Sequence, residues 1–222
     1  MTDTTDTDVP VRAVLFDFGG VFINSPFAAV ETAAERLGST VAELTPLIFG
    51  SYDEDTDHPW HRLERGEISF EASQVAIRAL ADEAGMGHLD PFAVLAEMAG
   101  ALEVRDFMVD AVRRYRAAGR LTGIVTNNIA EFGSTWRGLI PVDELFDDIV
   151  DSSAVGLRKP DARIFHLACE RLGVAPAEAA FVDDHAGNVA GAQAAGLAAV
   201  CCGYTVESTR AALVELDRLA GC

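Results

Sequence analysis

The stretch VRAVLFDFGG (residues 11–20) joins a short apolar run to an abrupt polar ending. Its first six residues have strand composition; Asp17 follows directly, and Gly19 and Gly20 come after Phe18. The same pattern returns twice, where LTGIVT (121–126) runs into two asparagines and AAFVD (179–183) runs into a second aspartate. The sequence therefore predicts short buried strands with polar residues at their carboxyl ends.

Helical patterns alternate with these strands, and LAAVCC (197–202) supplies a last strand. The predicted helices lie at about 104–118, 129–138, 161–172, 186–196 and 206–219. Short apolar strands that alternate with helices indicate an α/β fold with a parallel sheet covered on both faces. Open sheets of this kind bind ligands at the carboxyl ends of their strands.

Residues 25–100 break the alternation, because they contain three or four amphipathic helical segments and no convincing strand. We interpret them as a helical cap domain inserted after the first strand. Residues 11–24 and 101–222 then form the α/β core domain, and the polar residues 1–10 form a disordered acidic tail.

Composition narrows the class of protein. The 222 residues include 17 basic and 35 acidic side chains, so the formal charge is −18, which disfavours nucleic-acid binding. No run of about 18 apolar residues occurs, so we expect no membrane span. The N-terminus lacks the features of a signal peptide, and the four cysteines show no C-x-x-C spacing. We expect a cytoplasmic protein, as a monomer or homodimer.

Two adjacent carboxylates, Asp183 and Asp184, end a predicted buried strand. Such a pair repels itself at low dielectric unless one member is neutralised or a cation binds between them. A helix cap would account for one aspartate but not for both. A hard divalent cation, most simply Mg²⁺, accounts for the pair and for Asp17 as well.

Lys159 and Thr126 are further candidates. Lys159 precedes Pro160 at the entry of a predicted helix, and it is the best candidate cation to balance the carboxylates and a phosphate. Its neighbour Arg158 is interpreted as a solvated charge. Thr126 ends the middle strand, so its hydroxyl is expected at the sheet edge.

The order of these residues closely resembles the haloacid dehalogenase-like (HAD) hydrolase superfamily. Its four motifs match as FDFGGVF (16–22), IVTNN (124–128), GLRKPD (156–161) and FVDDHAGN (181–188). The resemblance covers roughly residues 11–203 and implies a Rossmann-like sheet with a small helical cap. Together with WHRLERGEIS (60–69), the first motif is most similar to sugar-phosphate phosphatases and the N-terminal phosphatase-like domains of epoxide hydrolases.

The resemblance implies a phosphatase of small phosphorylated metabolites, with sugar phosphates among the candidate substrates. Asp17 would be the nucleophile and would form an aspartyl-phosphate that water hydrolyses. Thr126 and the amide of Asn127 would hold the phosphoryl oxygens. Lys159 would neutralise the nucleophile and the phosphate together.

The resemblance also implies Mg²⁺ as the cofactor. Asp17, Asp183 and Asp184 would hold the metal, with Asp184 as a direct ligand, and the carbonyl of Gly19 would complete the protein ligands. Asn188 would orient Lys159 or a metal-bound water.

Gly19 departs from the pattern, because most phosphatases of the superfamily carry an aspartate there as general acid and base. Loss of such a group typically costs about 10²–10⁴-fold in rate. A 2-haloacid dehalogenase that uses Asp17 without metal is therefore the alternative enzyme, and His185 is a second candidate proton carrier. A non-catalytic binding protein and a phosphorylation-dependent receiver are the remaining alternatives. The receiver fits poorly, since it would place the acidic pair on the first strand.

The predicted cap contains a polar cluster around Trp60. Its other members are His58, His61, Arg62, Glu64, Arg65, Glu67 and Ser69. We interpret the cluster as a polar helix face with surface histidines, from which one or two cationic or aromatic groups could reach the substrate.

Overall fold

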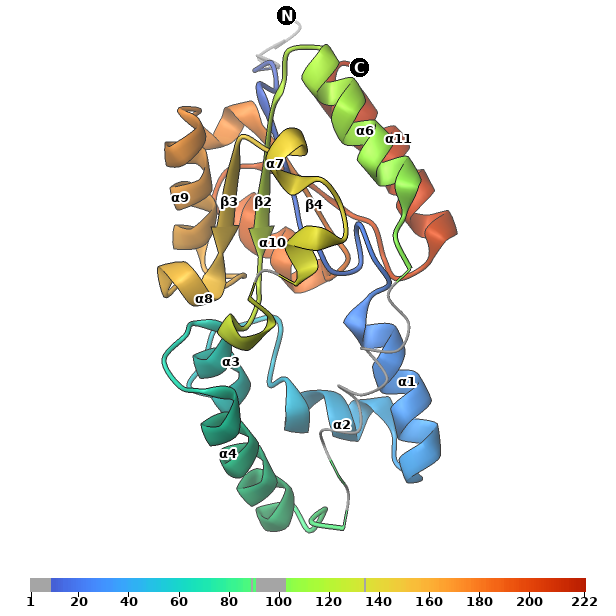
Figure 1. The fold of residues 1–222 in the computed structure, drawn as a ribbon, viewed down its shortest axis with the longest axis vertical. Coiled ribbons are helices and arrows are strands. Elements are labelled where there is room, and N and C mark those ends of the chain that lie inside the picture. The colour runs from blue at the N-terminus through green and yellow to red at the C-terminus, as the bar shows by residue number, and fades with distance from the viewer. Residues whose placement is uncertain (1–8, 89, 91–102, 134) are drawn as a thin grey trace, which may run out of the picture.

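The computed structural model of the chain describes residues 9–88, 90, 103–133 and 135–222. Five parallel strands form one sheet in the order β3-β2-β1-β4-β5, so the α/β fold is confirmed (Figure 1). The strands are β1 (Ala13–Phe16), β2 (Leu121–Thr126), β3 (Asp148–Asp151), β4 (Ala179–Asp183) and β5 (Ala198–Cys201).

The central strand β1 is buried on both faces, as its near-continuous apolar sequence predicts. Val14 and Phe16 pack toward α6 (Asp106–Ala117) and α11 (Val206–Ala220). Ala13 and Leu15 belong to the opposite cluster, which includes α9 (Ala162–Leu172) and α10 (Ala186–Ala194). Helices therefore cover both faces of the sheet (Figure 1).

Shorter elements connect the strands and helices. They are η1 (Ala130–Phe132), η2 (Trp136–Gly138), α7 (Val142–Leu145), α8 (Ser152–Val155) and η3 (Pro176–Glu178).

Two expectations about the core need correction. The single helix expected at 129–138 is wrong, because η1 and η2 are separate 3₁₀ turns and Gly133 between them has φ +44°. Strand β3 was not expected, since four residues with an aspartate at each end give only a weak strand signal. It pairs with β2 at the edge of the sheet.

Among the described residues between β1 and residue 90, four helices follow β1 and lie beyond the carboxyl ends of the strands (Figure 1). They are α1 (Pro26–Leu37), α2 (Val41–Ile48), α3 (Pro59–Glu64) and α4 (Phe70–Glu83). Their apolar side chains form a separate cluster around Phe49, Trp60 and Leu63, which Ile129 joins from the core. Most of the expected tail at 1–10 and the end of the expected cap near residue 100 lie outside the described residues.

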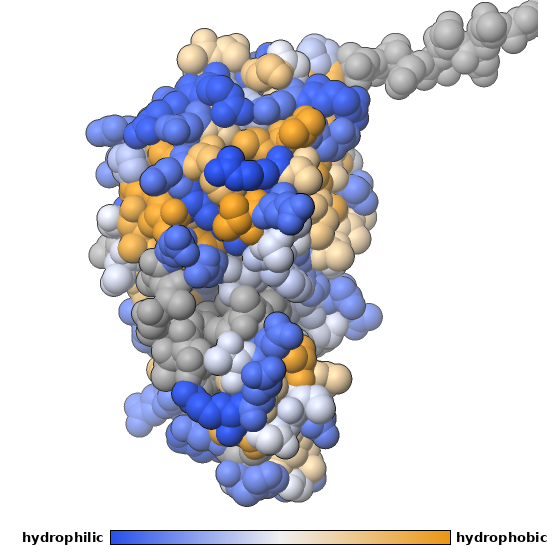
Figure 2. Space-filling model, turned by 90° about the vertical axis from the view of Figure 1, so that its right-hand side faces the viewer, coloured by the Kyte–Doolittle hydropathy of each residue, from blue (hydrophilic) through white to orange (hydrophobic). Residues whose placement is uncertain are grey.

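The face shown in Figure 2 is chemically mixed. Hydrophilic side chains are interspersed with smaller hydrophobic areas on the side where α6 and α11 lie (Figure 2). Within the described ranges, no helix combines the length and hydrophobicity needed to cross a bilayer.

Candidate active site

The carboxyl ends of β1 and β4 bring three buried aspartates together. Asp17 directly follows β1, Asp183 ends β4 and Asp184 follows it. One ligand atom from each carboxylate lies within 4.8 Å of the others. We call these three residues the acid cluster.

Lys159 is the cation of the acid cluster. Its Nζ lies 2.8 Å from Asp17 Oδ1 and 2.6 Å from Asp183 Oδ2, and its side chain is buried. The Asn127 side chain holds the lysine backbone from both sides: Lys159 N donates to Asn127 Oδ1 (2.8 Å), and Asn127 Nδ2 donates to Lys159 O (3.0 Å). Lys159 is also the only lysine among the 222 residues.

Asp17 is fixed by the turn that follows β1. The backbone N–H of Phe18 donates to Asp17 Oδ1 at 2.7 Å, the same oxygen that faces Lys159. Gly20 has φ +71°, and a Cβ atom built there would lie 2.0 Å from Asp184 Oδ2. Glycine is therefore required at this position for two reasons: the positive φ angle and the close approach of the Asp184 side chain.

The two adjacent aspartates have different surroundings. Both oxygens of Asp183 accept hydrogen bonds from Asn188 Nδ2 (3.1 and 3.2 Å), and Oδ1 also accepts from His185 N at 2.8 Å. Asp184 Oδ2 accepts a hydrogen bond from the hydroxyl of Ser25, immediately before α1. Asp183 is thus saturated by protein donors, whereas Asp184 is left better able to bind a cation.

The cluster carries more negative charge than Lys159 neutralises. Burial raises the pKa of Asp17 to about 7; the charge of Lys159 opposes this rise and that of Asp183 adds to it. Burial, followed by repulsion from Asp183 and Asp17, raises the pKa of Asp184 well above its usual range. Burial alone would lower the pKa of Lys159, but Asp17 and Asp183 together raise it. A cluster of hard oxygen donors with surplus negative charge fits a divalent cation such as Mg²⁺.

The remaining predicted residues lie near the acid cluster. Thr126 ends β2, is buried, and makes no hydrogen bond through its hydroxyl to any residue that the structure describes. The side chain of Asn127 is occupied by Lys159, so only its backbone amide remains for an anion. Gly19 lies between Asp17 and Gly20 in the turn after β1.

His185 is the N-cap of α10, and its Nδ1 accepts from Gly187 N at 3.1 Å. Its ring centroid lies 5.1 Å from that of Tyr52, and burial lowers its pKa.

Sequence reasoning missed Arg105. Its Nη1 donates to the carbonyl of Gly20 and to Thr209 Oγ1 (2.8 Å), and its Nη2 donates to Tyr204 O at 3.1 Å. This buried arginine joins the turn after β1 to the start of α11. Nothing near Arg105 in the sequence distinguishes it from a surface arginine.

The interpretation of Arg158 as a solvated charge is wrong. The residue is fully buried, and its Nε donates to Glu64 Oε2 of α3 at 2.8 Å. Glu64 Oε1 also accepts from Tyr52 Oη (3.0 Å) and Trp60 Nε1 (2.9 Å). A balanced ion pair thus joins the segment that carries Lys159 to the helices after β1.

The polar cluster around Trp60 is not a solvated helix face either. Trp60 and His61 are buried, and burial, reinforced by the charge of Arg158, lowers the pKa of His61 to about 3. Arg65 pairs with Asp55 and Glu67, and the exposed Arg62 pairs with Glu67. The α3 face is therefore an internal polar contact with the core.

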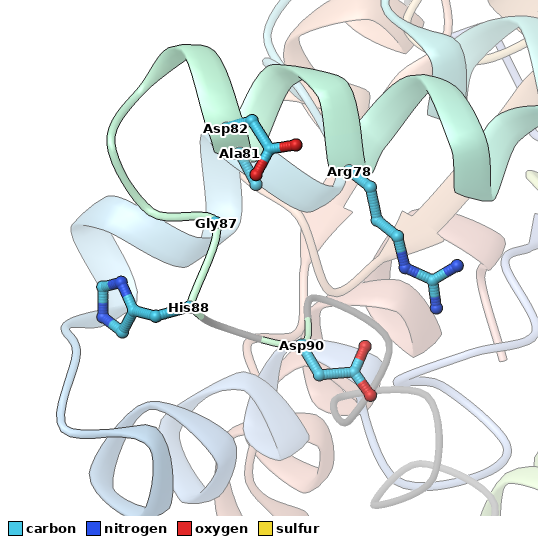
Figure 3. Close-up of a pocket in the computed structure, with 6 residues that line it drawn as sticks. All are labelled: Arg78, Ala81, Asp82, Gly87, His88 and Asp90. Carbon is cyan, nitrogen blue, oxygen red and sulfur yellow. The ribbon is translucent and has the colours of Figure 1, made fainter.

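A hollow of about 390 Å³ lies elsewhere, at the end of α4 (Figure 3). Its lining residues are Arg78, Ala81, Asp82, Gly87, His88 and Asp90. None of the acid cluster lines it, so it is not part of the candidate site.

Three relatives illustrate the range of similar proteins. Acyl-CoA dehydrogenase family member 10 of Mus musculus is 31% identical over 216 residues, covering 95% of this chain but only 19% of that protein. The sesquiterpene phosphatase astK of Aspergillus oryzae is 27% identical and is covered over 97% of its length, against 95% of this chain. (S)-2-haloacid dehalogenase 1 of a Pseudomonas strain is 27% identical, with 84% of this chain and 82% of the dehalogenase covered.

Solved structures show the same fold. A HAD family enzyme of Bacteroides thetaiotaomicron, crystallised with magnesium and inorganic phosphate, superposes with a TM-score of 0.60 at 20% identity. The superposition covers 87% of this chain and 95% of that enzyme. The model of the haloacid dehalogenase-like hydrolase family matches residues 11–196. Because this match covers most of the chain, the protein belongs to the haloacid dehalogenase-like hydrolase family and is a hydrolase.

Proposed function

We propose that the protein is a Mg²⁺-dependent phosphatase of small phosphorylated metabolites, with sugar phosphates among the candidates. The observation that carries this proposal is the surplus of negative charge in the acid cluster, where three buried carboxylates share one lysine. A carboxylate nucleophile that displaces halide has no need of two further buried carboxylates. The phosphatase relative supports the same choice.

Asp17 acts as the nucleophile. Its Oδ1 accepts from Phe18 N and faces Lys159 Nζ, so Oδ2 is the oxygen left to attack phosphorus. A bond forms between Asp17 Oδ2 and phosphorus and the ester P–O bond breaks. The leaving alkoxide takes the electron pair and, because Gly19 offers no acid, a proton from water. Water then hydrolyses the acyl phosphate, which restores Asp17 and releases inorganic phosphate.

Three other residues receive the phosphoryl group. Lys159 lowers the combined negative charge of the nucleophile and the phosphate, and its fixed backbone places the ammonium without reorganisation. The Thr126 hydroxyl and the Asn127 amide donate to the phosphoryl oxygens. Their position after β2 supports this role, because β2 lies next to β1 in the sheet.

Asp17, Asp183 and Asp184, with the carbonyl of Gly19, would hold Mg²⁺. The cation supplies charge neutralisation and orientation of the phosphate. Asp184 is the stronger candidate for a direct ligand, since Asp183 is already saturated by Asn188, His185 N and Lys159. Asn188 thereby acts through Asp183, which it orients.

Residues 25–100 form the cap that selects the substrate in this proposal, and residues 11–24 with 101–222 form the catalytic core. The position of α1–α4 beyond the carboxyl ends of the strands supports this division (Figure 1). The substrate's alcohol portion would then contact the cap, while its phosphate binds at the sheet edge.

The second candidate is a 2-haloacid dehalogenase, which Gly19 favours because halide leaves without a proton. A relative of that activity also exists. The two candidates differ in their dependence on a divalent cation.

The deciding experiment measures two products in parallel from chelator-treated protein, with and without added Mg²⁺. We expect phosphate release from 4-nitrophenyl phosphate only with Mg²⁺, no chloride release from 2-chloropropionate, and at least about a 10⁴-fold loss of phosphate release in Asp17→Asn. Chloride release that persists with chelator would favour the dehalogenase. Neither product under any condition would favour a non-catalytic binding protein.

A further inference from the structure

The helices after β1 are more acidic than the rest of the molecule. Residues 25–100, which we call the block, contain 14 acidic and 4 basic side chains, a net charge of −10. The other 146 residues carry the remaining −8. All 17 basic residues of the chain fall within the described ranges. The positions that the structure does not describe therefore cannot contribute another basic side chain.

The basic side chains of this block are already engaged. Arg65 pairs with Asp55 and Glu67, and Arg62 also pairs with Glu67. Arg36 and Arg78 have interactions of their own. No cation of the block is therefore left over for an anionic part of a substrate.

The part of the block that meets the site carries an unbalanced carboxylate. A Cβ built on Gly187, three residues after Asp184, would lie 2.6 Å from both Asp53 Oδ1 and Tyr52 O. Residues 52 and 53 are therefore in direct contact with the first turn of α10. Within the described part of the chain, Asp53 is exposed and forms no ion pair.

Arg65 contacts the loop at residues 51–58 through its ion pairs with Asp55 and Asp57, and the second cation beside this loop is Arg158. Its guanidinium lies 5.3 Å from the centre of the Tyr52 ring. Glu64 neutralises it at 2.8 Å, and Asp55 Oδ1 lies 3.7 Å from its Nη1. Its Nη2 has no described hydrogen-bond partner, but that atom is enclosed and does not face solvent. Arg158 thus stabilises the contact with the core and offers no charge to a ligand.

We propose that the alcohol portion of the substrate carries no charged group of its own. The protein hydrolyses phosphate monoesters of neutral alcohols and discriminates against esters that carry a carboxylate or a second phosphate. The inference rests on the proposed phosphatase function. Its physical basis is that Lys159 and a bound cation attract one phosphate, while the acidic loop and the −10 charge of the block repel any further anion.

Two esters of nearly equal size test the proposal: 2-hydroxyethyl phosphate and 2-phosphoglycolate differ mainly in a neutral hydroxymethyl group against a carboxylate. We expect kcat/KM to favour the neutral ester by about tenfold or more at low ionic strength. The preference should shrink as salt rises, because screening weakens the repulsion.

Two variants at Asp53 test whether this carboxylate causes the preference for the neutral ester. Asp53→Asn should reduce the preference several-fold, and Asp53→Lys should reduce it further, mainly through better use of phosphoglycolate. Asp57→Asn is the matched control, because it removes the same charge from a fully exposed side chain of the same loop. It should leave the preference unchanged.

Equal or better hydrolysis of phosphoglycolate would overturn the inference while leaving the phosphatase function intact. A preference that Asp53→Asn and Asp57→Asn reduce equally would overturn the assignment to the loop against α10. Failure to hydrolyse any ester, 4-nitrophenyl phosphate included, would instead overturn the proposed function and the inference with it.

Discussion

Arg158 and Lys159 are neighbours in the sequence and both are fully buried. Both side chains meet carboxylates, but the balance of charge around them differs. Arg158 meets a carboxylate that also accepts from Tyr52 and Trp60, so its charge is balanced within a satisfied network. Lys159 meets Asp17 and Asp183, with Asp184 completing the cluster, so negative charge remains in excess. A buried ion pair with balanced charge is typical of a structural contact, whereas a buried cluster with excess charge is typical of a ligand-binding site.

The two environments predict different effects of mutation. Removing a partner from the balanced pair should reduce stability more than it impairs the chemistry. Removing a member of the acid cluster should impair chemistry and metal binding, and can even stabilise the metal-free protein.

The largest expected effect on stability is that of Glu64→Gln. The glutamine keeps the acceptor shared by Tyr52 and Trp60 but removes the nearest counter-charge of Arg158. Only Asp55 Oδ1 then remains, 3.7 Å away and already paired with Arg65, so the loss should be about 3 kcal/mol. Chemical unfolding measures the loss. Glu215→Gln is the control, because it removes one carboxylate of an exposed pair on α11 and should change stability little. Equal losses in the two variants would refute a special role for the buried pair.

Lys159→Ala should lower kcat/KM for a phosphate ester by about 10²–10³-fold, since the phosphate loses its fixed cation. Lys159→Arg should restore only part of the rate, because a planar guanidinium does not fit a point-charge site. Arg113→Ala on the surface of α6 is the control. Near-normal kinetics in the alanine variant would remove Lys159 from the mechanism.

Ser25→Ala should weaken Mg²⁺ binding by about 10–100-fold, because Ser25 orients the Asp184 carboxylate. Ser25→Thr keeps the hydroxyl and should retain more of the affinity. Ser73→Ala is the matched control: this serine is also buried and donates to a backbone carbonyl, Phe70 O, at 2.8 Å. Calorimetric affinity that is unchanged in Ser25→Ala would show that the hydroxyl has no part in the metal site.

The smallest expected effect is a pH-dependent gain in stability for Asp17→Asn without metal. The folded-state pKa of Asp17, about 7, exceeds its ordinary value of 3.8, so the folded protein holds a proton that the unfolded chain has lost between these values. The contribution of Asp17 to stability therefore declines as pH rises from about 4 to about 7. The asparagine variant escapes that decline and should melt a few degrees higher at pH 8 but almost equally at pH 4. The histidines are the same in both proteins, so their contributions cancel. A melting difference that does not change with pH would contradict the raised pKa.

Sequence reasoning could predict the parts of the site that follow strands. Asp17, Thr126 and Asp183 each lie at the end of an apolar run, and parallel strands bring such ends to one edge. Lys159 was recognisable from its place before proline and a helix. The structure brings Lys159 to Asp17 and Asp183 as that interpretation requires.

The missing contacts connect residues that are far apart in the chain. Arg158 and Glu64 are separated by 94 positions, and Ser25 and Asp184 by 159. Each residue taken alone is typical of a surface or a helix start. Their pairing depends on how α1–α4 pack over the core, which hydrophobic periodicity does not specify. Strand β3 was missed for a local reason, because Asp148 and Asp151 occupy half of its four residues.

Calorimetric titration of metal-free protein with Mg²⁺, at pH 7.5 and in parallel with Asp184→Asn, tests the central claim most directly. The surplus charge of the acid cluster predicts one saturable site per chain in the wild type and its loss, or at least about a tenfold weakening, in the variant. No saturable binding in the wild type, or equal affinity in the two proteins, would contradict the account.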